Sequence, residues 1–312
     1  MNLFPAKQLK LFGLNKYLEE IIYLFKNDKF PNKILLTGPK GSGKSTLAYH
    51  LINYIFSQNE SNNYNLKEKI IYEENKSFKL ISNNIHPNFY LIDLLDQKIN
   101  IEISQIRKLI DYSNKSSFNN LPRLILIDNL EYLNINSLNA LLKIIEEPNY
   151  NMHFILIHNS NKKIADTLRS RCLSFKIHLT FDESILISNQ LLDQNLLNFF
   201  HHDLISHYDT PGNFVNLANF TIENKIDIKN LDLKNFLALL ITKNYYKKDD
   251  FIKNNISKFI ELFFLKRISS SNNQNKLNSL YFDFIKKMSE TKKFNLDLES
   301  LFIEFENKIL NA

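Results

Sequence analysis

The sequence predicts an α/β fold with a parallel sheet, followed by a segment built only of helices. Short apolar runs alternate with longer stretches whose apolar residues have helical spacing, a pattern typical of parallel sheets covered by helices. Three of the five glycines in the 312 residues lie together in residues 38–43. Beyond Gly212 the chain contains neither glycine nor proline, which favours an all-helical C-terminal part.

Composition excludes several classes of protein. The single cysteine, Cys172, rules out an internal disulfide and a cysteine-cluster zinc site, so we expect no zinc. The sequence lacks both a signal-peptide pattern and an apolar run of the roughly 18 residues that a membrane span needs, so we expect a cytoplasmic protein without a membrane partner. The net charge of +6 suits a nucleic-acid neighbour but is also common in proteins that bind none.

The N-terminal part leads into a phosphate-binding motif. Residues 6–26 are predicted to be amphipathic and helical, with an interruption at Gly13. Ile34–Thr37 reads as a buried strand that runs directly into Gly-Pro-Lys-Gly-Ser-Gly-Lys-Ser at residues 38–45. This octapeptide has the G-x-x-x-x-G-K-[ST] spacing of a phosphate loop. A chance match is the alternative, and the scarcity of glycine elsewhere counts against it.

The residue types of this loop suit nucleotide binding. Glycines let successive backbone N–H groups turn inward around phosphate oxygens. Lys44 is expected to reach the terminal phosphates, and the Ser45 hydroxyl to bind Mg²⁺. A helix that begins near Lys44 would direct the positive end of its dipole at the nucleotide.

The middle of the chain supplies further elements. Residues 57–79 are polar with weak periodicity, and we interpret them as a surface excursion. A strand is predicted over Phe89–Leu95, with His86 as a turn residue before it. A helix is predicted over Ile103–Tyr112.

A strand that ends in an acid is predicted at Arg123–Asp128, where Asp128 follows a buried apolar run. Asp128 is the expected second Mg²⁺ partner of the phosphate loop. The next residue, Asn129, carries an amide, which cannot serve as the base that accepts a proton from the water that attacks the nucleotide. Glu131 is expected to point elsewhere. The sequence therefore supports nucleotide binding better than hydrolysis.

The remaining elements of the first part complete a sheet. Asn134 or Asn136 can cap a helix, and Pro148 ends it. Two further strands are predicted at Phe154–Ile157 and Leu173–Ile177. The apolar stripe of the helix consists of Leu138, Leu141, Leu142 and Ile145. From Phe181 onward the spacing is helical, with a loop expected at Ser269–Asn275.

The order of these motifs resembles a known family. A strand ending in Asp128, an Asn-Ala-Leu-Leu-Lys helix, a Glu-Glu-Pro stop, a strand and Ser170-Arg171-Cys172 resemble the ATPase core of bacterial clamp-loader subunits. The best match is the delta-prime subunits of the DNA polymerase III clamp loader. The resemblance covers residues 12–178, and beyond them it rests on architecture and short motifs.

The resemblance implies a RecA-like AAA+ P-loop domain over residues 1–178, a small helical lid over 179–220 and a helical collar over 221–312. It implies ATP and Mg²⁺ as cofactors and a hetero-pentamer with gamma/tau and delta subunits, which loads the sliding clamp on primed DNA. The expected nucleotide-binding residues are Gly38, Pro39, Lys40, Gly41, Ser42, Gly43, Lys44, Ser45, Thr46, Asp128 and Asn159, with Ser45 and Asp128 at the metal.

The resemblance also assigns Arg171 as an arginine finger that acts in trans on the ATP site of a neighbouring subunit, whereas Arg169 points elsewhere. The chain departs from active members of the family at Asn129, where they carry glutamate. It also lacks their zinc cysteines, and Asn213 follows Pro-Gly where a sensor arginine can stand. We therefore expect a delta-prime-like subunit that binds ATP weakly or structurally. An active gamma/tau-type motor ATPase is the alternative, and a small-molecule P-loop kinase or an unrelated nucleotide-binding enzyme is a third interpretation.

Overall fold

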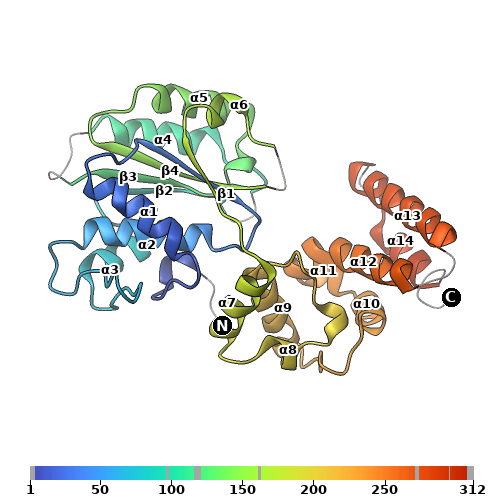
Figure 1. Cartoon of the computed structure of the whole chain (residues 1–312). Coiled ribbons are helices and arrows are strands. Elements are labelled where there is room, and N and C mark those ends of the chain that lie inside the picture. Colours follow the sequence, from blue (N-terminus) through green and yellow to red (C-terminus); the bar gives the residue numbers. More distant parts are fainter. Residues whose placement is uncertain are drawn as a thin grey trace. The chain divides into compact units, whose positions relative to one another are not determined.

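The computed structural model describes residues 4–95, 98–115, 121–160, 163–270, 274–294 and 296–307. The chain forms two compact units (Figure 1). The first comprises residues 1–190 together with 210–212, and the second comprises 191–209 together with 213–312. The division into a lid and a collar at residue 220 stays a prediction.

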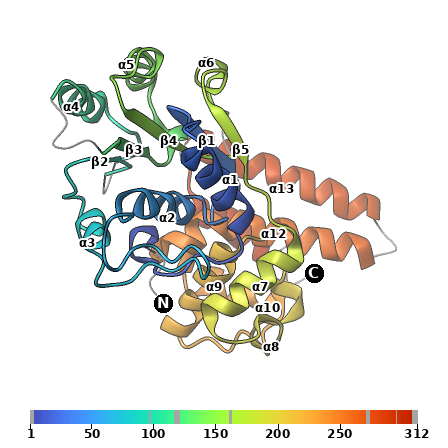
Figure 2. The same cartoon turned by 60° about the vertical axis from the view of Figure 1, so that its left-hand side comes forward.

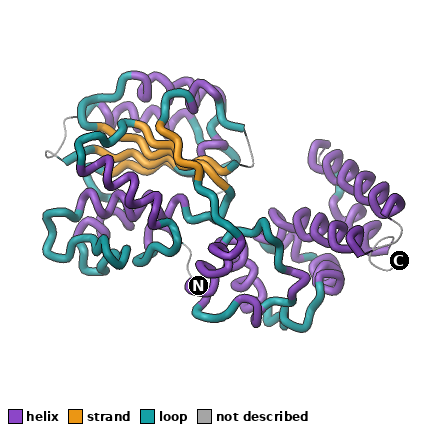
Figure 3. Tube along the Cα trace, viewed as in Figure 1, coloured by secondary structure: helices purple, strands orange, loops and turns teal. Residues whose placement is uncertain are grey.

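The first unit contains one parallel five-stranded sheet, drawn in orange in Figure 3. The strands lie in the order β2-β3-β4-β1-β5, and each neighbouring pair is parallel. Their bounds are β1 Lys33–Gly38, β2 Phe89–Ile92, β3 Arg123–Ile127, β4 Met152–Asn159 and β5 Leu173–Lys176. The predicted fold class, a parallel α/β domain followed by a helical part, is confirmed.

Helices cover both faces of this sheet (Figure 2). Because side chains alternate along a strand, Ile34 and Leu36 pack with α1 and α2 on one face. Leu35 packs with α4 and α5 on the other face. The helices of this layer structure are α1 Asn15–Lys26, α2 Lys44–Phe56, α3 Lys76–Ser82, α4 Ile103–Ser113, α5 Ile135–Glu146 and α6 Asp166–Arg169.

Two predictions about helix ends can be compared with the structure: the helical region at residues 6–26 and the capping residue of α5. Residues 6–26 do not form one helical region, because only a 3₁₀ turn (η1, Pro5–Lys7) precedes α1, which begins at Asn15. Gly13 has a φ of +76°, a left-handed conformation that breaks the helix as predicted. Of the two candidate caps, Asn134 caps α5, since its Oδ1 accepts the Ser137 N–H at 2.8 Å.

The interpretation of residues 57–79 as a surface excursion needs a correction, because the segment is largely exposed but is anchored in the core. Tyr64 and Ile71 are only 6% and 2% exposed and belong to the core on the α2 face. The Tyr64 hydroxyl lies 2.9 Å from Nδ1 of buried His50. The segment is polar on average, but these isolated apolar residues anchor it to the domain.

The second unit is helical, and its described residues include no strand. Helix α7 (Phe181–Leu192) spans the boundary between the units, and α9 begins in the first unit at Pro211. The core is rich in phenylalanine; the rings of Phe284 and Phe305, for example, lie 4.9 Å apart. The other helices are α8 Leu196–Phe199, η3 His202–Leu204, α9 Pro211–Glu223, α10 Leu233–Thr242, α11 Tyr245–Lys248, α12 Asp250–Ser270, α13 Gln274–Phe294 and α14 Leu298–Phe305.

The loop predicted at residues 269–275 overlaps the end of α12 and the start of α13, and residues 271–273 between these helices lie outside the described part of the chain. Across the described ranges, none of the helices combines the length and the apolar character needed to cross a bilayer.

Candidate nucleotide-binding site

The phosphate loop connects the carboxyl end of β1 to the amino end of α2, as the sequence predicts. Gly41 and Gly43 have φ values of +84° and +85°, which side-chain-bearing residues rarely adopt. Gly38 is required for a different reason, since a Cβ there would lie 2.4 Å from the backbone oxygen of Ile177. The three clustered glycines therefore serve backbone conformation at two positions and close packing at the third.

Lys44 lies at the centre of the loop and is only 3% exposed. Its Nζ donates to the backbone oxygens of Gly38 and Pro39 at 3.0 and 2.6 Å. Burial lowers the pKa of Lys44 to about 8, an effect that the negative charges of Asp128 and Glu131 oppose. The ammonium group therefore stays largely charged at neutral pH and faces the loop that would receive phosphate.

Ser45 and Asp128 meet as predicted for a pair of metal ligands. The Ser45 hydroxyl donates to Oδ2 of Asp128 at 2.5 Å. Burial raises the pKa of Asp128 to about 6, and the hydrogen bond from Ser45 acts against this rise. A hydroxyl and a carboxylate oxygen are the hard ligands that Mg²⁺ prefers, so these two residues fit the ion that accompanies a bound nucleotide.

A network of carboxylates and amides lies beside this pair. Asn129 has a left-handed backbone (φ +55°), and its Nδ2 donates to Oδ1 of Asp93 at 2.7 Å. Asn159 donates from Nδ2 to Oε1 of Glu131 at 2.7 Å and to Oδ1 of Asn129 at 3.2 Å. The backbone N–H of Asn159 donates to Oε2 of Glu131 at 3.0 Å. Asn159 thus lies beside the start of the phosphate loop, where it pairs with Gly38 in the β1–β4 ladder, and its role toward a nucleotide stays a prediction.

The prediction that Glu131 points elsewhere was wrong. After β3 the left-handed Asn129 leads into a 3₁₀ turn (η2, Leu130–Tyr132), and this turn brings the Glu131 carboxylate to the end of β4. Asn tolerates a left-handed backbone better than most residues, so Asn129 was the residue from which the turn after β3 could have been predicted.

Sequence reasoning also missed Asp93, because the predicted strand ran through it to Leu95. The strand β2 ends at Ile92, which places the Asp93 side chain at the carboxyl edge beside Asn129. The signal was the tripeptide Leu-Ile-Asp, which occurs at residues 91–93 and again at 126–128.

The Pro-Gly motif contacts the phosphate loop within the first unit. The Thr210 hydroxyl donates to the backbone oxygen of Lys40 at 2.9 Å, and the Gly212 N–H donates to that of Gly41 at 3.0 Å. A Cβ on Gly212 would lie 2.7 Å from Cα of Gly41. Glycine at position 212 therefore allows the start of α9 to approach the loop closely. Sequence reasoning did not assign this contact.

Arg171 lies at the amino ends of the strands, opposite the carboxyl ends where the phosphate loop lies. It precedes β5, whose first residue Leu173 pairs with Ile34, four positions before Gly38 on β1. At about 3.3 Å per residue, Leu173 lies roughly 13 Å before the level of Gly38 along the strand direction, and Arg171 precedes Leu173 in the chain. Its Nη2 pairs with Oε1 of Glu146 at 2.7 Å, and its Nη1 donates to the Thr167 oxygen at 2.7 Å.

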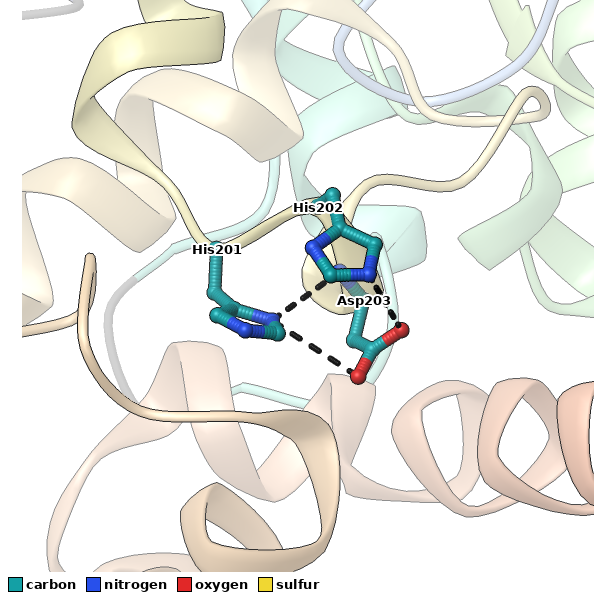
Figure 4. Close-up of side chains that lie close together, drawn as sticks. All are labelled: His201, His202 and Asp203. Carbon is teal, nitrogen blue, oxygen red and sulfur yellow. Dashed lines mark hydrogen bonds and ion pairs between the residues drawn. The ribbon is translucent and has the colours of Figure 1, made fainter.

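One group of possible metal ligands lies outside this site, in the second unit. His201, His202 and Asp203 converge around a 3₁₀ turn (Figure 4), with ring-nitrogen to carboxylate distances of 3.6 and 3.5 Å. The ammonium of Lys266 already lies 3.2 Å from Oδ1 of Asp203, and the Asp203 N–H donates to Nδ1 of His201. These contacts already use Oδ1 of Asp203 and Nδ1 of His201, atoms that a metal ion would need, so we assign no metal to this turn.

Comparison with known proteins shows the family to which the chain belongs. Residues 13–180, more than half of the chain, match the profile of a family described as "DNA polymerase III, delta subunit". The chain belongs to this family. The predicted resemblance to clamp-loader subunits is therefore confirmed.

Two relatives from Buchnera aphidicola cover most of the chain. DNA polymerase III subunit gamma of Buchnera aphidicola subsp. Schizaphis graminum is 28% identical over 82% of this chain and 68% of its own length. DNA polymerase III subunit delta' of Buchnera aphidicola subsp. Baizongia pistaciae is 24% identical over 97% of this chain and 82% of its own length.

The Pseudomonas aeruginosa delta' subunit is 27% identical, over 45% of this chain and 40% of its own length. Among solved structures, a DNA polymerase III gamma subunit-related protein of Thermotoga maritima is similar. Its TM-score is 0.46 and its identity 13%, over 93% of this chain and 95% of that one. The relatives include both gamma and delta' subunits, so they do not distinguish between these two subunit types.

Proposed function

We propose that the protein is a delta-prime-like subunit of the replicative clamp loader, which binds Mg·ATP weakly or structurally and scarcely hydrolyses it. The observation that carries this proposal is an intact phosphate loop beside Asn129. Lys44, Ser45 and Asp128 have the contacts and charges that a phosphate loop uses to hold a nucleotide. The residue that follows Asp128 is an amide rather than a carboxylate.

Asn129 limits hydrolysis for a chemical reason. The general base of a hydrolytic ATPase orients the attacking water and accepts its proton, and an amide oxygen is far too weak a base for the second task. The Asn129 Nδ2 is also committed to Asp93 at 2.7 Å. When bound, Mg²⁺ would neutralise phosphate charge between Ser45 and Asp128, which supports binding without supplying a base.

Arg171 supports the second half of the proposal, the supply of an arginine finger in trans. The phosphate loop of its own domain is at the far edge of the sheet, whereas the Arg171 side chain is 36% exposed and available to another molecule. A guanidinium can offset charge on a transferring phosphoryl group through a planar pair of donors. Glu146 orients this group in the free subunit.

The partners in this proposal are gamma/tau and delta subunits in a hetero-pentamer, together with the sliding clamp and primed DNA. In the proposed assembly, residues 179–220 act as the lid and 221–312 as the collar that joins the subunits, and the protein works in the cytoplasm. The second unit exposes the apolar side chains of Leu265, Phe282 and Ile303 on its helices, which supports a role in packing against other subunits.

A gamma/tau-type motor ATPase is the second candidate. It is favoured by the gamma relative and by two carboxylates, Asp93 and Glu131, that lie in the network beside Asp128. Either could act on water if the network rearranged.

Binding and phosphate release by the purified protein separate the two candidates. A fluorescent ATP analogue should bind in the presence of Mg²⁺, and Lys44→Ala should weaken binding by about 100-fold, since it removes charge-assisted contacts worth roughly 3 kcal/mol. Phosphate release should be negligible. Steady release that Lys44→Ala abolishes would establish the motor instead, and identical binding curves would mean that the loop binds no nucleotide.

A further inference from the structure

Glu131 occupies the donors of Asn159, the residue at the end of the strand that neighbours the phosphate loop. We propose that the Glu131 carboxylate makes this site select nucleoside diphosphates over triphosphates. The inference rests on the proposed nucleotide binding and concerns which nucleotide the loop retains.

The position of Asn159 ties it to the loop. In the β1–β4 ladder Asn159 pairs with Gly38, the first residue of the motif, and Ser160 N–H donates to the Gly38 oxygen at 3.0 Å. The same Gly38 oxygen accepts a hydrogen bond from Nζ of Lys44. Since this lysine contacts the terminal phosphates in phosphate loops, Asn159 lies at the terminal-phosphate end of the site.

The Asn159 donors face a carboxylate of this chain. Both oxygens of Glu131 are engaged, one by the backbone N–H of Asn159 at 3.0 Å and the other by its Nδ2 at 2.7 Å. The remaining contact of Nδ2 is to Asn129 at 3.2 Å. Asn159 is only 5% exposed, so the contact is protected from water. A γ-phosphate that used these donors would have to displace Glu131.

The charges at this site also disfavour binding of a triphosphate. Asp93, Asp128 and Glu131 carry three carboxyl groups at this edge, and Lys44 is the buried cation among them. A triphosphate carries more negative charge than a diphosphate, and the extra charge is on the group that would lie nearest Glu131. Like charges brought together at a partly buried site repel more strongly than in water. Removal of the Glu131 charge should therefore favour the triphosphate selectively.

The test compares the dissociation constants of Mg·ADP and of a β,γ-methylene ATP analogue, measured by calorimetry on the full-length protein. Glu131→Gln removes the charge and keeps an acceptor for Asn159. The wild type should bind ADP more tightly than the analogue. In Glu131→Gln, the ratio of the two constants should shift toward the analogue by roughly tenfold, the factor that about 1.4 kcal/mol produces. Binding of ADP should change little.

Glu147→Gln is the matched control, because this exposed glutamate follows α5, whose end lies by Arg171 at the opposite edge. Glu131→Ala is the second variant, and thermal unfolding of each variant verifies that both are folded. If ADP binds but neither Glu131 variant shifts the ratio, the inference is wrong and the proposed nucleotide binding stands. If neither nucleotide binds the wild type, both are wrong.

Discussion

The two edges of the parallel sheet differ in how their charged residues are held. At the carboxyl edge Lys44 is almost fully buried, Ser45 and Asp128 are bonded directly, and burial shifts the pKa values of Lys44 and Asp128 toward neutrality. At the amino edge Arg171 is exposed and contacts one exposed glutamate and one backbone oxygen. The first arrangement suits the nucleotide that we propose this chain binds, and the second suits the proposed role of Arg171 toward another molecule.

The carboxyl edge should show a pH window for nucleotide binding. Asp128 must be ionised to bind the metal, so affinity should fall as the pH drops through about 6, the pKa to which burial raises this group. Lys44 must be protonated to attract phosphate, so affinity should fall as the pH rises through about 8. Each limb should approach tenfold per pH unit, since one proton is involved.

Calorimetric titration of Mg·ADP from pH 5 to pH 9.5 measures this window. Arg171→Ala is the control, because a residue at the amino edge should leave the profile unchanged. A flat profile between pH 5 and 9.5 would show that burial does not tune this site.

The contact of Gly212 with the loop should matter less. In Gly212→Ala the new Cβ meets Cα of Gly41, and overpacking of this kind costs about 1–3 kcal/mol. We expect a lower thermal midpoint or a roughly tenfold weaker affinity for Mg·ADP, depending on whether the loop yields. The exposed Asn216→Ala on the same helix is the control. A variant as stable and as tight as the wild type would show that the close approach is dispensable.

The smallest effect belongs to the amino edge. Glu146→Gln removes the partner of Arg171, but an exposed ion pair contributes only about 0–1 kcal/mol. We expect the free energy of unfolding to change by less than about 0.5 kcal/mol in 0.15 M salt. Urea denaturation measures it, and a loss above about 2 kcal/mol would mean that Arg171 is a structural residue rather than an available one.

The elements predicted well from the sequence are those that depend on local pattern. The strand before Gly38, the phosphate loop and the capped helix that begins at Ile135 each follow from adjacent residue types. The positions of Lys44, Ser45 and Asp128 could be predicted because parallel strands bring their carboxyl ends to one edge.

The network around Asn159 could not be predicted in the same way. The Glu131 contact depends on the left-handed backbone of Asn129, and the Asp93 contact depends on the end of β2 and its register beside β3. These are tertiary properties without a period in the sequence. The burial of Tyr64 was missed for a similar reason, since a single anchor in a polar segment produces no periodic signal.

The central claim is the proposal that Arg171 of this protein acts in trans at the ATP site of a neighbouring subunit. The direct measurement is the ATPase rate of the clamp loader reconstituted with its other subunits, the clamp and primed DNA, with Arg171→Ala beside Arg169→Ala. Arginine fingers contribute roughly 10³–10⁵ in rate in other phosphoryl-transfer enzymes. A smaller loss is expected here, because in the proposed assembly only one of several ATP sites would face this protein.

Arg171→Lys should restore the rate poorly, because an ammonium does not present the planar pair of donors of a guanidinium. The account predicts a loss of DNA- and clamp-stimulated ATPase that is confined to the Arg171 variants, with assembly unchanged by gel filtration. A complex that contains Arg171→Ala, assembles normally and hydrolyses ATP at the wild-type rate would contradict it.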